Sequence, residues 1–214
     1  MVLLLVLGVG GFLGPRLLGF ASLPVNGMPL PPSDGRRGLP VIAGSTILLS
    51  LVAEYGFGME WPAYLRAAVV TAVVVDSLQL WRQPAVQTTL SRTVWIAHWL
   101  IVAGVWLVAF APRYRADFLH VLFVGGFSLL ILGVGTRVTL SHGGHNLARE
   151  RRSWPLRVGL TLGLIAMLAR VGAPFATASY FEHLALAAVL WMAGMICWGG
   201  YIVWVLKGSL PPQG

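Results

Sequence analysis

The sequence predicts an all-α membrane protein, a polytopic bundle of about seven transmembrane helices that forms a single domain over residues 1–214. Hydrophobic residues make up 57% of the chain and charged residues only 10%, whereas about 25% of the residues in a soluble domain are charged. The mean hydropathy is +0.79, and the nine tryptophans suit the membrane–water interfaces, where indole rings concentrate. These observations make the lipid bilayer the first expected partner of the chain.

The predicted spans are mainly apolar stretches of about 20 residues, long enough to cross the hydrocarbon core of a bilayer. They are residues 2–22, 39–57, 61–81, 93–111, 117–140, 155–173 and 179–206. The first stretch lacks a basic start and a small-residue cleavage site, which favours a transmembrane helix over a removed signal peptide. Cys197 is the only cysteine, so an intrachain disulfide is excluded.

The basic residues gather on one side of the predicted bundle. That side receives Arg16, Arg36, Arg37, Arg82, Arg92, Arg149, Arg151, Arg152 and Lys207. The other side receives mainly Arg66, Arg113, Arg115 and Arg170. Because basic loops stay in the cytoplasm, the N-terminus is expected outside and the C-terminus inside. The formal net charge of +8 is explained in this way without nucleic acid, for which the sequence shows no binding motif.

Three histidines lie at the predicted cytoplasmic boundary. His98 is early in the fourth span, and His142 and His145 follow the fifth. A neutral imidazole is the usual protein ligand for copper, zinc and haem iron, and a spacing of three places two side chains on one side of a continuing helix. We therefore expect a metal site here, with solvated helix-end histidines as the alternative for His142 and His145.

Two further histidines lie near the outer face, His120 at the start of the fifth span and His183 at the start of the seventh. A b-type haem held between helices needs two axial ligands at matching depth, and this pair meets that condition. The alternative is that each imidazole simply hydrogen-bonds at the interface, to Asp117, Glu182 or water.

Three charged residues lie within or at the ends of apolar spans, where ionisable groups are costly. Arg137 could pair with a haem propionate or an anionic lipid head, or extend to the interface as a helix-end arginine. Asp76 and Glu54 are expected to face the protein interior. A structural ion pair, for Asp76 with Arg92 or another cation, is favoured over a proton relay or a solute path.

Glycine pairs within the spans are expected to let helices approach closely. They occur at Gly125-Gly126, Gly133-Val-Gly135 and Gly199-Gly200, and in the first span from Gly8.

Two segments carry a resemblance to a known family. Arg137-Val-Thr-Leu-Ser-His142-Gly-Gly-His145 resembles the signature near the C-terminal end of the NnrS family, and Gly8-Val-Gly-Gly-Phe-Leu-Gly-Pro-Arg-Leu-Leu-Gly19 is similar to a helix of that family. His120 and His142 match two of its histidines, whereas His145 stands where an arginine is more usual. The resemblance implies a polytopic membrane protein that contains haem and copper and is linked to nitric oxide, with this chain corresponding to the C-terminal half of a longer member.

The sequence and the resemblance together favour an inner-membrane protein that binds haem b, copper or both in redox or nitric-oxide-related physiology. The candidate cofactor-binding residues are His120, His183 and Arg137, and the candidate metal ligands are His98, His142 and His145. Whether the protein is an enzyme stays open, because no catalytic constellation is evident. A structural accessory subunit of a larger redox membrane complex is the alternative, and a small-solute or metal transporter is a third possibility.

Overall fold

The computed structural model describes residue 18, residues 39–142 and residues 153–208. Every regular element in these residues is helical. The α-helices are α2 (Leu39–Phe57), α3 (Pro62–Leu78), α4 (Thr89–Phe110), α5 (Arg115–His120), α6 (Ser128–His142), α7 (Trp154–Gly172) and α8 (Tyr180–Gly208). A π-helix, η3 (Val121–Phe127), joins α5 to α6, and short 3-10 turns occupy Pro112–Tyr114, Ala173–Phe175 and Thr177–Ser179.

The observed helices lie on the predicted spans, apart from the stretch 2–22, which lies outside the described residues. Four helical stretches are long and apolar enough to cross a membrane, namely Thr89–Phe110, Pro112–His142, Trp154–Phe175 and Thr177–Gly208. The stretch Val41–Phe57 of α2 is apolar and 10–17 residues long, and α3 has 17 residues. The all-helical prediction is confirmed for the described part of the chain, whereas seven spans and the placement of the termini stay predictions.

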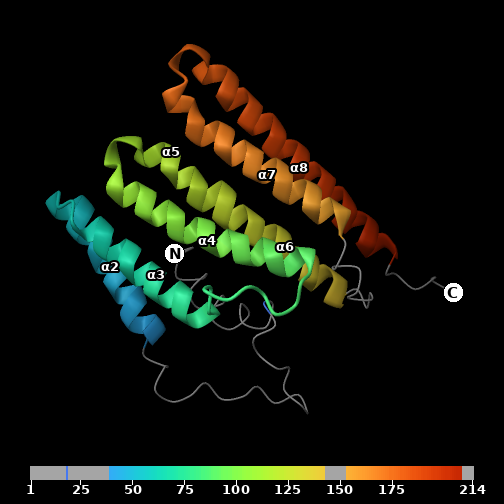
Figure 1. The fold of residues 1–214 in the computed structure, drawn as a ribbon, viewed down its shortest axis with the longest axis horizontal. Helices are drawn as coiled ribbons and strands as arrows, with labels where there is room; N and C mark the ends of the chain where they lie inside the picture. The colour runs from blue at the N-terminus through green and yellow to red at the C-terminus, as the bar shows by residue number, and fades with distance from the viewer. Residues whose placement is uncertain (1–17, 19–38, 143–152, 209–214) are drawn as a thin grey trace.

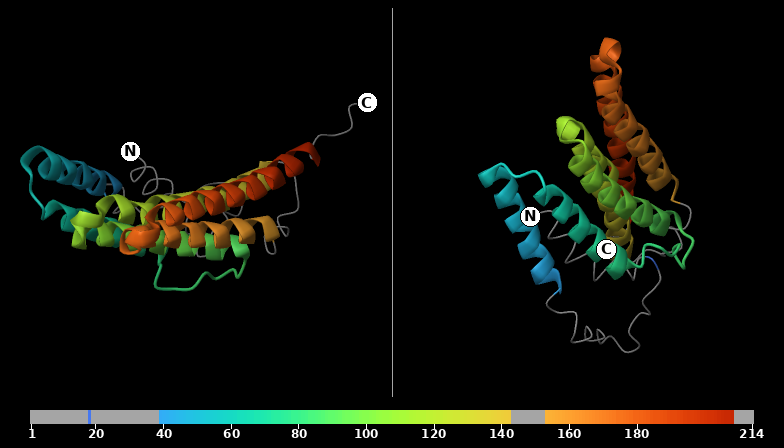
Figure 2. Two further views of the ribbon diagram at one scale, coloured as in Figure 1. Left: turned by 90° about the horizontal axis from the view of Figure 1, so that it is seen from above. Right: turned by 60° about the vertical axis from the view of Figure 1, so that its left-hand side comes forward.

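The helices lie side by side in chain order and alternate in direction, with α5, η3 and α6 forming one continuous stretch (Figure 1). At the centre, α4 contacts α3 on one side and α5, η3 and α6 on the other. Helix α7 packs against η3 and α6, and α8 packs mainly against α7. Figure 2 shows the result as an elongated slab, with α2 and α3 at one edge and the α7–α8 hairpin at the other. Ligand sites in such a bundle are expected between neighbouring helices.

The start of α4 shows how local sequence sets a boundary. The predicted span begins at residue 93, but the helix begins at Thr89 because Thr88 caps it. The Thr88 hydroxyl accepts from the backbone N–H of Ser91 at 3.1 Å, and the Ser91 hydroxyl accepts from the backbone N–H of Thr88 at 3.1 Å. This reciprocal pair satisfies two N–H groups that a helix start leaves open. The cap adds one polar turn before the apolar stretch.

The antiparallel succession places the connections at two opposite ends. The end with the α2–α3, α4–α5 and α7–α8 connections is called the Glu54 end, and the end where α3, α6 and α8 finish is called the His142 end. The described basic residues divide as the sequence predicted, with Arg66, Arg113, Arg115 and Arg170 towards the Glu54 end. Arg82, Arg92 and Lys207 lie towards the His142 end. Which end faces the cytoplasm stays a prediction.

Glycines allow close helix contacts, as predicted for Gly125-Gly126 and for Gly133-Val-Gly135, where a Cβ added to Gly135 would lie 2.9 Å from Cζ2 of Trp198. A Cβ added to Gly125 would lie 2.5 Å from the Met167 sulfur, and one added to Gly126 would lie 2.5 Å from Ile101 Cγ1. At Gly199 and Gly200, an added Cβ would meet nothing within 4 Å among the described residues. Close approach is therefore concentrated where η3 passes between α4 and α7.

Candidate functional site

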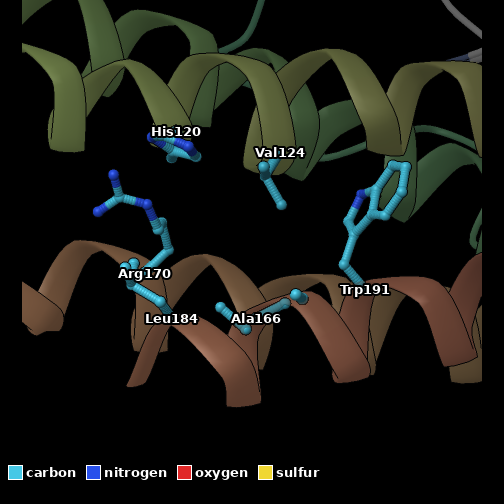
Figure 3. A pocket seen from close by; sticks show the side chains of 8 residues that line it. His120, Val124, Ala166, Arg170, Leu184 and Trp191 are labelled. Carbon is cyan, nitrogen blue, oxygen red and sulfur yellow. The ribbon is translucent and has the colours of Figure 1, made fainter. Parts of the chain in front are cut away.

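A cavity of about 290 Å³ lies between η3, α7 and α8, towards the Glu54 end. Side chains from all three elements and from the end of α5 line it, among them His120, Val124, Ala166, Arg170, Leu184 and Trp191. Figure 3 shows His120 and Arg170 near one end of the cavity and Trp191 at the other. The walls between them are apolar, so the polar groups are confined to a few positions, as in most small-molecule sites.

His120 is the last residue of α5, immediately before the π-helix. Its Nδ1 donates to the backbone carbonyl of Ala116 at 2.8 Å. Because a carbonyl can only accept, Nδ1 carries the proton, and in the neutral ring Nε2 then presents its lone pair. π-Helical turns often occur at functional sites, because the extra residue re-aims the side chains around it. Here the π-helix directs Val124 into the cavity that His120 borders.

Arg170, in the last turn of α7, reaches the same cavity. Its Nη1 donates to Oδ1 of Asp117 at 2.5 Å, and the two side chains are only 19% and 15% exposed. This ion pair balances the guanidinium charge at the edge of the cavity. A guanidinium has five N–H donors, so Arg170 can hydrogen-bond a ligand while it keeps Asp117.

His183 lies at the same Glu54 end, in the first turn of α8, which agrees with the predicted depth. It is half-buried, and its Nδ1 lies 2.9 Å from the Ser179 carbonyl oxygen and 3.2 Å from the Ser179 hydroxyl. It precedes Ala187 by one turn but is not among the residues that line the cavity. Asp117, which the sequence suggested as a hydrogen-bond partner of the outer histidines, instead accepts from Arg170.

His98 is the most buried histidine in the described residues, with 2% of its surface exposed. Its Nδ1 donates to the Val94 carbonyl at 2.7 Å. Its Nε2 is buried and has no hydrogen-bond partner within the described part of the chain. An unsatisfied buried polar atom costs about 1–3 kcal/mol, so this nitrogen is the strongest single indication of a bound group.

The other two histidines of the predicted inner cluster are His142 and His145. His142 ends α6, is exposed, and donates from Nδ1 to the Val138 carbonyl at 3.0 Å. His145 lies outside the described residues. No group of three His, Cys, Asp or Glu side chains suited to a metal occurs in residues 39–142 and 153–208. The three-histidine site therefore stays a prediction, because one of its members is not described.

Glu54 holds three helices together at its end of the bundle. Its carboxylate accepts from Arg66 of α3 at 2.7 Å and also from Arg115 of α5. Arg66 and Glu54 are 8% and 12% exposed, and the Arg115 guanidinium lies 4.9 Å from the Tyr55 ring centroid. Glu54 is thus the centre of a structural ion-pair network.

The sequence suggested Arg92 as a partner of Asp76. In the structure, the Arg92 guanidinium donates to the side chain of Gln87.

Comparison with known protein families identifies the family to which the chain belongs. The family described as NnrS protein matches residues 1–207, which is nearly the whole sequence. The chain belongs to the NnrS family. No curated protein and no solved structure gives a match. Together with its long apolar helices, this membership makes the chain an NnrS-family membrane protein.

The described histidines of this NnrS-family protein share one geometry that the sequence did not reveal. In His98, His120, His142 and His183, Nδ1 lies 2.7–3.0 Å from the carbonyl oxygen four residues earlier. This contact orients each ring and leaves Nε2 as the acceptor, the arrangement that metal-ligating histidines usually show. Any histidine in a helix can form this hydrogen bond when its rotamer permits. The pattern therefore shows that each ring can ligate a metal through Nε2, and it does not show that a metal is bound.

Arg137 lies on α6, one and a half turns before His142, and is half-buried. Its position near the His142 end agrees with the prediction, since the helix that carries it ends at His142. It lies on a different end of the bundle from His120 and His183. A role for Arg137 beside a haem held by those two histidines therefore finds no support in its position, whereas a role near His98 and His142 is compatible with it.

Proposed function

We propose that this NnrS-family membrane protein binds haem b, copper or both through its histidines and acts in redox or nitric-oxide-related physiology. Two findings support the proposal. The first is membership of the NnrS family over residues 1–207. The second, which carries the most weight within the structure, is the buried Nε2 of His98 without a hydrogen-bond partner in the described residues.

The donor chemistry of His98 fits such a group. Its ring is oriented by the Val94 carbonyl, and its free nitrogen lies among apolar side chains of the core, where water is excluded. A neutral imidazole suits copper and haem iron equally. When bound, haem or copper would supply one-electron and diatomic-gas chemistry, whereas the chain would contribute ligands, orientation and a dry surrounding.

The proposal assigns copper to His98, His142 and His145, with Arg137 towards an anion or a propionate at the same end. His120 and His183 are proposed as axial ligands for haem b at the Glu54 end. The residues 39–142 and 153–208 do not complete a three-ligand set, so a copper site at the His142 end requires His145 or a further ligand.

The variant His98→Ala tests this assignment. We expect its content of copper or haem iron per protein to fall by at least about tenfold, the scale on which loss of a supporting or ligating group lowers metal affinity. The measurement is elemental analysis with a haem assay on protein that elutes as a single species in size-exclusion chromatography. The control is Thr46→Val, a half-buried position on α2 whose hydroxyl donates to the Ile42 carbonyl at 2.8 Å and has no other side-chain hydrogen bond among the described residues.

Because His98 is buried, His98→Met serves as a second variant of similar size that retains a soft ligand atom. We expect it to fold and to keep part of any copper while it loses haem iron or shifts its spectrum. Unchanged metal content in both His98 variants and in the pair His142→Ala, His145→Ala would contradict the inner site.

A further inference from the structure

We propose that the cavity between η3, α7 and α8 binds a neutral aromatic ring that carries a hydroxyl group and dissolves in the membrane, a ligand of the quinol class. The inference concerns binding alone. It goes beyond the proposed function and does not require a bound metal, because it rests on the cavity, on His120 and on Arg170. It is an alternative to a haem on His120 and is compatible with a copper site at the His142 end.

The size of the cavity limits the ligand. Its volume of about 290 Å³ lies at the lower end of small-molecule pockets, which range over roughly 300–1,000 Å³. Val124, Ala166 and Leu184 make its walls apolar. A single substituted ring fits this space and these walls, whereas a haem macrocycle would require the helices to separate.

The polar end of the cavity matches a hydroxyl group. His120 presents Nε2 as an acceptor, because its Nδ1–H is bonded to the Ala116 carbonyl. Arg170, which borders the same end in Figure 3, can only donate. A hydroxyl both donates and accepts, so one quinol oxygen can donate to His120 and accept from Arg170. A carbonyl or an ether oxygen would leave the His120 nitrogen without a donor.

The charge balance favours a neutral ligand over an anion. The guanidinium of Arg170 is already paired with the Asp117 carboxylate at 2.5 Å, and both side chains are largely buried. A carboxylate or phosphate ligand would bring a second negative charge beside Asp117 in an apolar setting, where an uncompensated charge is costly. A neutral hydroxyl uses the remaining donors of Arg170 without disturbing the ion pair.

The position of the cavity explains how such a ligand would reach it. Its walls come from three stretches long and apolar enough to span a membrane. The cavity reaches the outside of the bundle at Trp191, which lines it and is 37% exposed. Trp191 lies at the far end from His120 (Figure 3), where its ring can pack against an aromatic ring. A ligand dissolved in the bilayer can therefore enter between the helices.

The test is calorimetric titration of the purified full-length protein in lipid nanodiscs. The probe is a short-chain ubiquinol, and the matched control ligand is its dimethyl ether, which has the same ring but no hydroxyl. We expect saturable binding of the quinol and at least about tenfold weaker binding of the ether, a ratio that corresponds to about 1.4 kcal/mol. Equal binding of the two ligands, or no saturable binding of the quinol, would overturn the proposal.

Variants locate the binding site. His120→Leu and Arg170→Lys are each expected to weaken quinol binding by about tenfold or more, since each removes or displaces one hydrogen bond in an apolar site. Trp191→Phe should reduce the change in tryptophan fluorescence that accompanies quinol binding, whereas Trp204→Phe, exposed on the same helix, should not. Wild-type affinity in His120→Leu and Arg170→Lys would contradict the assignment even if the quinol binds elsewhere.

Metal and haem content of the same preparations separates this inference from the proposed function. Loss of haem in His120→Leu would identify His120 as an iron ligand and overturn the quinol site. Intact metal content without quinol binding would contradict only the cavity proposal. Quinol binding that depends on His120, in a protein without metal, would support the cavity and contradict the proposed function.

Discussion

Replacing Glu54 by glutamine is expected to destabilise the protein far more than the same exchange at an exposed glutamate. The change leaves the Arg66 guanidinium, 8% exposed, buried without its partner, and loss of one member of a buried ion pair costs about 3–5 kcal/mol. The hydrogen bond from Arg66 to the Ser50 hydroxyl at 3.4 Å is too weak to compensate. The measurement is thermal unfolding in detergent micelles, followed by circular dichroism.

Glu60→Gln provides the matched control, because Glu60 is exposed near the same end of the bundle. Its effect should stay within about 0.5 kcal/mol, as for most surface exchanges. The double variant Glu54→Gln, Arg66→Met should recover most of the stability, since removal of both charges removes the desolvation penalty. Equal unfolding temperatures for Glu54→Gln and Glu60→Gln would show that the carboxylate does not hold α2, α3 and α5 together.

The second large effect is expected from Gly104→Ala in α4. An added Cβ would lie 2.9 Å from the backbone nitrogen and 3.1 Å from the Cα of Leu122, near the start of the π-helix. Backbone atoms cannot rotate away, so α4 and η3 must separate. Overpacking of this kind costs about 1–3 kcal/mol, and the separation should also disturb the cavity that begins at His120. Unfolding temperature and quinol affinity measure the two consequences.

Gly199→Ala is the control for that substitution, because an added Cβ meets nothing within 4 Å there. Since alanine favours a helix over glycine by about 0.5–1 kcal/mol, this variant should be as stable as the wild type or slightly more so. If Gly104→Ala and Gly199→Ala unfold alike, the close approach of α4 and η3 is not a determinant of the fold.

The helices could be predicted from the sequence because apolar length is a strong local signal. The stretches 39–57 and 155–173 lie within one residue of α2 and α7. The π-helix at Val121–Phe127 could not be predicted in this way. It adds one residue to a turn without altering composition or apolar periodicity, so nothing local separates it from an α-helix.

The partners of the candidate residues were harder to predict than their depth. His120 and His183 lie at one end of the bundle, as expected, but only His120 lines the cavity. From the sequence, Arg170 is only one of the basic residues on the less basic side, and it lies 53 positions after Asp117, its partner in the structure. Which helices become neighbours is decided by tertiary packing, and neither residue alone indicates the other.

The burial of His98 was also not predictable from the sequence. Its position early in a span indicated a boundary residue, yet its ring is inside the core. The helix begins four residues earlier than predicted, through the Thr88 cap, which moves His98 a full turn deeper. Only the packing of the helices shows that Nε2 is buried and has no hydrogen-bond partner among the described residues.

An optical spectrum of the purified protein tests most directly whether this NnrS-family protein carries a redox-active group on its histidines. Spectra of the oxidised and reduced protein are recorded alongside elemental analysis for iron and copper. The proposed function predicts a Soret band with stoichiometric iron, stoichiometric copper, or both. A protein that is folded and monodisperse but contains neither haem nor copper would contradict the proposed function and favour an accessory subunit of a larger membrane complex.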